Sequence, residues 1–222
     1  MPDYFPPVDK ATEDGLLAVG GDLDIETLTE AYLHGIFPWP VEENYPLTWF
    51  SPNPRGVILK EDIHFPKSFL KALKKMTFSY KFNSDFSEVI TQCAQAKRKN
   101  ELGTWIIDDI SSGYTSLFNA GKAYCISVYN EDSELIGGLY GVCFGKLISG
   151  ESMFYKESGA SKFALYQLLN TVKKSDIPFI DTQMVTPTIE LFGGKNIERE
   201  DFIEMIKSLD TDIPRDQLFS CT

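Results

Sequence analysis

The stretch AYCISVYNEDSELIGGLYGVCFGKLISGESMF, residues 123–154, is the strongest indicator of the fold. It contains three successive runs, 123–129, 134–144 and 146–154, that are rich in the β-branched, aromatic and apolar residues typical of strands. The polar residues 130–132 separate the first two runs, and the step Gly145-Lys146 separates the last two. Connections this short favour neighbouring antiparallel strands, so the stretch predicts a β-meander.

Helical patterns lie on both sides of this meander. Before it, apolar residues recur at helical spacing over 66–76, 86–94 and 110–118, and an alternating pattern predicts a strand at 77–82. After it, we expect a helix over 164–172, a buried strand at 177–181, a short helix beginning at Thr186-Pro187 and a last helix from about 199 to 209. This succession predicts an α+β fold. It is also the layout of acyltransferases built on the acetyltransferase-type (GNAT) scaffold.

The first sixty residues differ in composition from the rest, being rich in proline, glycine and aromatic residues around one clear helix. Asp24 can cap that helix, Leu28, Ala31 and Tyr32 form its apolar side, and Gly35 suits its end. We therefore predict a small N-terminal α/β domain at residues 1–58 and a GNAT-like catalytic domain at residues 59–222.

The composition argues against several classes of protein. A net charge of -11 over 222 residues opposes non-specific binding to nucleic acids or anionic membranes. No apolar stretch reaches the ~18 residues of a membrane-spanning helix, and residues 1–5 lack the features of a secretory signal. Four irregularly spaced cysteines and two histidines make a structural zinc site or a histidine-based triad a poor expectation. We expect a cytoplasmic protein with no membrane association, metal or cofactor.

Asp181 and Gln183 follow the predicted strand at 177–181. In extended backbone, residues two apart face the same way, so the two side chains can share one target or bond to each other. The alternative is that they only end the strand and cap the next turn.

Ser149, Glu151 and Met153 alternate along the third strand of the meander, which predicts that they share one face. An ionised glutamate is costly to bury without a partner, so either this face is open to solvent or Glu151 lines a pocket. Met153 suits a hydrophobic core and also a pocket that accepts variable apolar side chains.

Trp39 and Trp105 both follow turn or loop residues. Buried tryptophan usually belongs to a core, whereas a pair of exposed indole faces can stack on a nucleobase. Lysines are also concentrated at 67–75 and basic residues at 97–99, against the acidic balance of the chain. They form a solvated surface or a local contact with phosphates.

The loop 156–161 stands where acetyl-CoA enzymes of the GNAT scaffold hold a pyrophosphate. Lys156 and Ser161 replace the arginine or glutamine and the small residue expected there. This poor agreement argues against coenzyme A as the donor.

Taken in order along the chain, these residues resemble the leucyl/phenylalanyl-tRNA–protein transferase family. The shared segments run in order along most of the chain and include DGLLAVGGDL (14–23), GIFPW (35–39), WFSPNPR (49–55), TWI (104–106), GGLYGV (137–142), GESMF (150–154) and ID-x-Q (180–183). The resemblance implies an aminoacyltransferase that moves Leu, Phe or Met from charged tRNA to the N-terminal Arg or Lys of acceptor proteins, which marks them for degradation. Its partners would be aminoacyl-tRNA and those proteins, with no cofactor.

The same resemblance implies roles for individual residues. Asp181, Gln183 and Glu151 match the family's catalytic and binding positions. Our own hypothesis is that Asp181 takes up the proton of the attacking amine, directly or through Gln183, and that Glu151 orients the aminoacyl group or attracts the basic acceptor. Trp39 and Trp105 would hold the 3′-terminal adenosine. The amino-acid side chain would lie, beside Glu151, against Leu139, Ile148, Met153, Leu165, Leu168 and Ile180. Lys74 and Lys75 would contact the tRNA.

Several positions depart from the family pattern, among them the segment 191–194 and some positions of the amino-acid pocket. Tyr124 and Ser127 stand where the family has a histidine and a glutamate, and Thr188 replaces a histidine that follows the catalytic pair. Two alternatives to the transferase hypothesis therefore stay open. One is a GNAT-type acyl-CoA acyltransferase, and the other is a catalytically silent relative that binds charged tRNA or basic peptides.

Overall fold

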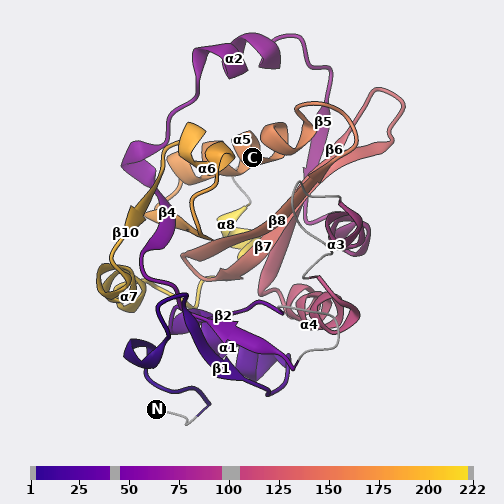
Figure 1. Ribbon diagram of the computed structural model, residues 1–222. Helices are drawn as coiled ribbons and strands as arrows, with labels where there is room; N and C mark the ends of the chain where they lie inside the picture. Colours follow the sequence, from indigo (N-terminus) through magenta and orange to yellow (C-terminus); the bar gives the residue numbers. More distant parts are fainter. Residues whose placement is uncertain (1–3, 41–45, 97–105, 220–222) are drawn as a thin grey trace.

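The computed structural model describes residues 4–40, 46–96 and 106–219 (Figure 1). Within these ranges the chain has a mixed α and β architecture with a three-stranded and a seven-stranded sheet. The α+β class predicted from the sequence is thereby confirmed. None of the helices in the described ranges has the length and apolar character needed to cross a bilayer.

The N-terminal part contains the smaller sheet, with strand order β1-β3-β2. It is built from a short 3-10 helix at Val8–Lys10, β1 (Leu16–Val19), α1 (Ile25–Leu33), β2 (Phe37–Pro38) and β3 (Thr48–Phe50). As predicted, Asp24 caps α1, because its carboxylate accepts a hydrogen bond of 2.8 Å from the backbone N–H of Thr27. The three strands are too short and irregular to have been predicted.

The larger sheet has the strand order β10-β4-β9-β8-β7-β6-β5. Its strands are β4 (Arg55–Leu59), β5 (Ser79–Phe82), β6 (Ala123–Tyr129), β7 (Leu135–Phe144), β8 (Leu147–Tyr155), β9 (Phe179–Gln183) and β10 (Gly194–Ile197). The predicted meander is confirmed, since β6, β7 and β8 pair antiparallel in sequence order. Strands β8 and β9 are parallel. Strand β4, which follows the N-terminal part in the sequence, pairs with β9. The domain boundary at 58/59 stays a prediction.

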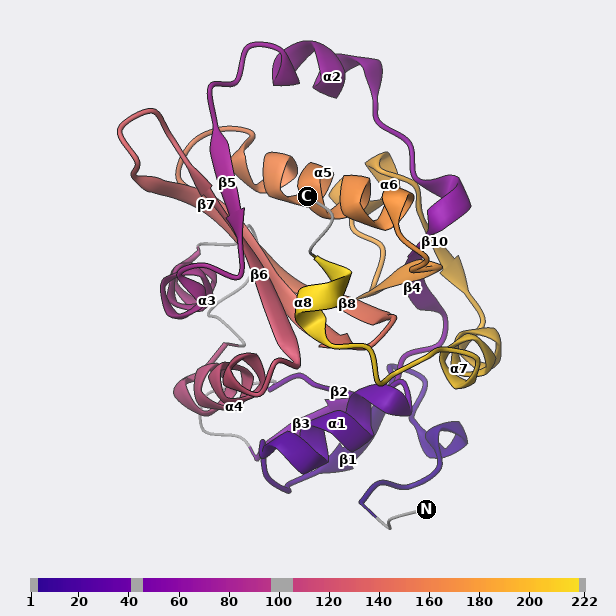
Figure 2. The same cartoon turned by 180° about the vertical axis from the view of Figure 1, so that it is seen from behind.

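Helices cover both faces of the larger sheet (Figures 1 and 2). One face packs against α3 (Phe86–Gln95), α4 (Asp108–Asn119) and the N-terminal part. The other face packs against α5 (Ala160–Lys174). The remaining helices are the 3-10 helix Lys60–Asp62, α2 (Lys67–Leu73), α6 (Pro187–Leu191), α7 (Arg199–Lys207) and α8 (Arg215–Leu218).

The helix predicted at 66–76 needs a correction. It is the shorter helix α2, and its buried residue is Phe69, whereas Leu70 and Leu73, which the apolar spacing would place inward, are only partly buried. Phe69 packs edge-on against Phe192. This aromatic contact, rather than the spacing of the leucines, sets which side of the helix is buried. Helix α8 was not predicted from the sequence.

Candidate active site

Strand β8 carries a bulge at Glu151. Tyr140 of β7 lies opposite Ser152, and the next residue of β7, Gly141, lies opposite Gly150, so Glu151 has no partner in the ladder. A side chain at Gly141 would overlap the carbonyl oxygen of Ser149, so only glycine lets the strands approach this closely. Bulges are common beside active sites because they redirect a side chain.

The bulge corrects the prediction that Ser149, Glu151 and Met153 share one face. Ser149 and Glu151 do share a face and bond to each other, on the side of α1 and α4. Met153 lies opposite Leu139 and packs with it into the cluster under α5, on the other side of the sheet. One extra residue in a strand reverses the facing of every residue after it.

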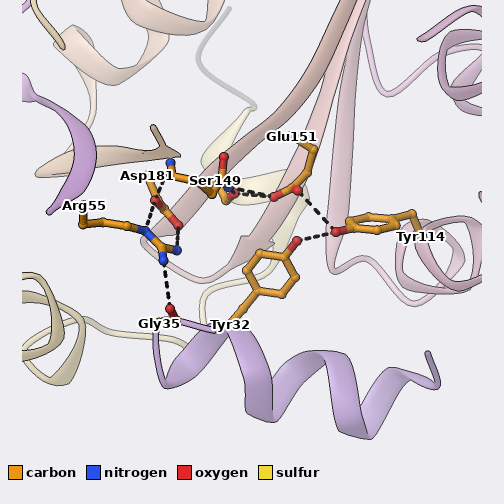
Figure 3. A network of polar contacts seen from close by, with 8 residues as sticks. Tyr32, Gly35, Arg55, Tyr114, Ser149, Glu151 and Asp181 are labelled. Atoms are coloured by element: carbon orange, nitrogen blue, oxygen red, sulfur yellow. Dashed lines mark hydrogen bonds and ion pairs between the residues drawn. The ribbon is translucent and has the colours of Figure 1, made fainter. Parts of the chain in front are cut away.

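Glu151 is the centre of a network of polar contacts (Figure 3). Its Oε1 accepts hydrogen bonds from the Ser149 hydroxyl and, at 3.2 Å, from Nε2 of Gln183. Its Oε2 accepts one from the Tyr114 hydroxyl at 3.2 Å, and that hydroxyl is bonded to the hydroxyl of Tyr32. Burial raises the pKa of Glu151 from 4.5 to about 7, with the Ser149 hydrogen bond acting in the opposite direction. The carboxyl therefore titrates near neutral pH.

Asp181 is held by a buried ion pair. Nε of Arg55 donates to Oδ1 of Asp181 at 2.8 Å, and Nη2 donates to Oδ2 at 2.7 Å. Both side chains are almost fully buried, at 1% and 2% exposed. Arg55 also donates through Nη1 to the carbonyl of Gly35 at 2.9 Å (Figure 3). The Asp181 carboxylate is thus committed to protein partners on both oxygens.

Gln183 turns its side chain toward Glu151 through an unusual backbone conformation. Its φ of 55° lies in the left-handed region, which costs a non-glycine residue roughly 1 kcal/mol or more. The backbone N–H of Gln183 donates to Oδ1 of Asp181 at 3.0 Å, and its Nε2 donates to the Ser149 hydroxyl at 2.6 Å. Gln183 is therefore bonded to the Asp181 carboxylate through its backbone N–H, while its own side chain bonds to Ser149 and Glu151.

A small pocket opens beside this network, with a volume of about 60 Å³. Trp39 is half-buried here, and its ring centroid is 6.2 Å from that of Phe37. The structure thus brings together three of the predicted site residues, Trp39, Glu151 and Gln183. The pocket is lined by Phe37, Pro38, Trp39, Glu151, Gln183 and Met184.

The other predicted residues lie elsewhere. The six residues predicted to hold the amino-acid side chain all belong to the apolar cluster under α5: Leu139, Ile148, Met153, Leu165, Leu168 and Ile180. Lys74 and Lys75 are exposed at the end of α2, on the side of the molecule opposite the N-terminal part (Figure 1). Trp105 and the basic residues 97–99 lie outside the described residues.

Sequence reasoning missed three residues of the site. Arg55 was seen only as the end of the WFSPNPR segment, and Tyr32 and Tyr114 only as apolar positions of two helices. Their polar atoms meet the site only through contacts between residues far apart in the chain. The departing residue Tyr124 is buried, and its hydroxyl donates to the carbonyl of Ser149 at 3.1 Å, so it supports the bulge.

Comparison with known proteins gives consistent results. A family model described as leucyl/phenylalanyl-tRNA protein transferase matches residues 57–207, and a model of the N-terminal domain of the same transferase matches residues 21–53. The leucyl/phenylalanyl-tRNA–protein transferase of Lawsonia intracellularis is 45% identical over 202 residues, covering 91% of this chain and 88% of the relative. That of Flavobacterium johnsoniae is 42% identical over 205 residues, covering 92% and 96%.

The solved structures found are more distant. The C-terminal domain of a putative lysylphosphatidylglycerol synthetase from Agrobacterium fabrum has a TM-score of 0.40 and 9% identity, covering 73% of this chain and 52% of that one.

Proposed function

Because the chain belongs to the leucyl/phenylalanyl-tRNA protein transferase family, we propose that it transfers leucine, phenylalanine or methionine from charged tRNA to the N-terminal Arg or Lys of acceptor proteins. The activity is that of an aminoacyltransferase, and its products would be marked for degradation. The observation that carries the proposal at the level of residues is the meeting of Trp39, Glu151 and Gln183 in one pocket. An aromatic face, a carboxyl and an amide are the groups that such a transfer needs.

The donor is an ester that is already activated, so the protein has to position two reactants and accept one proton. In the proposed reaction the neutral α-amine of the acceptor attacks the ester carbonyl carbon. The new C–N bond forms, the bond to the ribose oxygen breaks, the amine loses a proton and the ribose oxygen gains one. Holding amine and ester together would supply most of the rate enhancement.

Glu151 is the better placed proton acceptor of the two carboxylates. Its pKa of about 7 lies close to the ~7.7–8.0 of a free α-amine, so a proton can move between the two groups at little cost. A proton on Asp181 would instead disrupt its paired bonds to Arg55. We therefore give Asp181 the task of holding Gln183, and Gln183 the task of positioning Glu151 and the amine.

We also propose which residues bind the charged tRNA. Trp39, together with Trp105, would stack on the terminal adenosine, at roughly 1–3 kcal/mol for each stacked base. The assignment of Leu139, Ile148, Met153, Leu165, Leu168 and Ile180 to the aminoacyl side chain stays a prediction, because these residues lie on the α5 side of the sheet and outside the pocket that Trp39 and Glu151 line. Lys74 and Lys75 would contact tRNA phosphates.

We also propose the scaffold and the cellular location of the protein. A meander followed by α5 and by the parallel strand β9 supports a GNAT-like scaffold for residues 59–222, with a small domain at 1–58. Burial raises the pKa of the thiols of Cys125 and Cys143 to about 12, which keeps them protonated and unreactive. We place the protein in the cytoplasm, where cysteines stay reduced.

The decisive experiment measures transfer of labelled phenylalanine from Phe-tRNA to a peptide that begins with Arg. We expect turnover with this peptide and with a Lys-initiated one, and none with the same peptide beginning with Ala. Binding of charged tRNA without turnover would refute the enzyme and support the silent relative. Transfer of an acyl group from acyl-CoA would support the GNAT-type acyltransferase instead.

A further inference from the structure

Arg55 occupies a position that the reaction described above does not use directly. Its guanidinium lies between two aromatic rings, with Cζ 4.9 Å from the centroid of Phe37 and 4.6 Å from that of Phe202. Its hydrogen bonds go to Asp181 on β9 and to the carbonyl of Gly35. One side chain thus joins the N-terminal part, the central sheet and α7.

One branch of these contacts leads to Gln183. Arg55 orients the Asp181 carboxylate, whose Oδ1 accepts the backbone N–H of Gln183. That bond helps to keep Gln183 in the left-handed conformation, which places its amide against Ser149 and Glu151. The direction of the catalytic amide therefore depends on the guanidinium.

The second branch leads to the opposite wall of the pocket. Gly35 and Phe37 precede Pro38 and Trp39, and Phe37 itself lines the pocket. The guanidinium therefore fixes the distance between the wall that carries Trp39 and the strand end that carries Gln183.

We propose that Arg55 is a positioning residue for aminoacyl transfer, which acts through Asp181 on Gln183 and through Phe37 on Trp39. This inference rests on the proposed function. Lysine cannot replace arginine here, because an ammonium cannot donate two parallel bonds to one carboxylate and a third to a carbonyl.

The test compares Arg55→Lys with a matched control, Arg215→Lys. Arg215 also lies over an aromatic ring, 4.6 Å from the centroid of Phe118, and also donates to backbone carbonyls, but it lies on α8 and outside the pocket. We expect Arg55→Lys to lower kcat about 100-fold, the size of effect that a misplacement of about 1 Å can have, with a smaller rise, of about tenfold or less, in the KM for Phe-tRNA because Trp39 is displaced as well. Arg215→Lys should lower Tm while leaving kcat within about twofold.

A double-mutant cycle with Asp181→Asn separates positioning from mere stabilisation. If Arg55 acts through Asp181, the double variant Arg55→Lys/Asp181→Asn loses hardly more kcat than the worse single variant. Multiplicative losses would show that Arg55 does not act through Asp181 and would overturn the proposal.

The remaining outcomes are also decisive. If Arg55→Lys folds and its kcat is unchanged, the inference about Arg55 is wrong and the transferase assignment stands. If the wild-type protein shows no aminoacyl transfer, both the assignment and the inference are wrong. If Arg55→Lys does not fold, Phe202→Leu replaces it in the test. This change loosens the packing of the guanidinium on the side away from the pocket. It should lower kcat about fivefold with a smaller rise in KM, and unchanged kcat there overturns the proposal.

Discussion

Replacing Glu151 by glutamine should change how the stability of the protein depends on pH. Burial raises the pKa of this carboxyl in the folded state from 4.5 to about 7. The folded protein therefore holds the proton more tightly than the unfolded chain, and the free energy of unfolding falls as the pH rises from about 4.5 through 7. Glutamine is uncharged at every pH, so Glu151→Gln removes this contribution.

The size of the effect follows from the two pKa values. The full difference is about 3 kcal/mol, at about 1.36 kcal/mol for each pH unit. Between pH 5 and pH 8, linkage gives about 2.5 kcal/mol of it. For a chain of this length that corresponds to a difference in Tm of roughly 5–10 °C. If Glu151 accepts the proton, its titration contributes a fall in kcat/KM of about tenfold for each pH unit below 7, in addition to the fall caused by protonation of the acceptor amine.

The assay is urea unfolding of the wild type and Glu151→Gln at pH 5, 6, 7 and 8, followed by tryptophan fluorescence. The wild type should lose about 2.5 kcal/mol relative to the variant across this range. Glu204→Gln, a change at an exposed carboxylate paired with Lys207, is the control and should follow the wild type. A wild-type-to-variant difference that stays constant within about 0.5 kcal/mol would show that the carboxyl does not titrate in this range, and the reasoning would fail.

Three further changes test other parts of the structure. Gly141→Ala should destabilise the protein by about 3 kcal/mol, because the added methyl group overlaps the carbonyl oxygen of Ser149. Gly150→Ala, on the opposite strand with open space beside it, is the control, and equal melting temperatures would contradict the bulge. Asp24→Ala removes the cap of α1 and should cost about 1 kcal/mol in urea unfolding. Trp39→Ala should weaken binding of an aminoacyl-adenosine analogue about tenfold or more, and unchanged affinity in a titration would exclude stacking.

Local pattern was sufficient for most of the regular elements. The helix over Phe86–Gln95 follows from apolar residues at helical spacing, and the meander follows from three apolar runs with short connections. Both signals depend on residues within a few positions of each other, which the sequence displays directly. The N-terminal strands gave no such signal, because each contains four residues or fewer.

The candidate site was predictable in its composition and less so in its geometry. The order of shared segments selected Trp39, Glu151 and Gln183, which do lie in one pocket. The same reasoning placed Met153 on the face of Glu151, because simple alternation cannot reveal a bulge that exists only in the pairing with β7.

The sequence was sufficient to predict the longer helices, the meander and the family that the chain resembles, because periodicity and motif order are properties of neighbouring residues. Which carboxylate faces the pocket and which is ion-paired depends instead on contacts between distant segments. The bond between Arg55 and Asp181 joins residues 126 positions apart. The direction of the Glu151 side chain depends on the bulge, where Glu151 has no partner in β7. Both depend on how separate strands pair, and that is set by the packing of the whole chain.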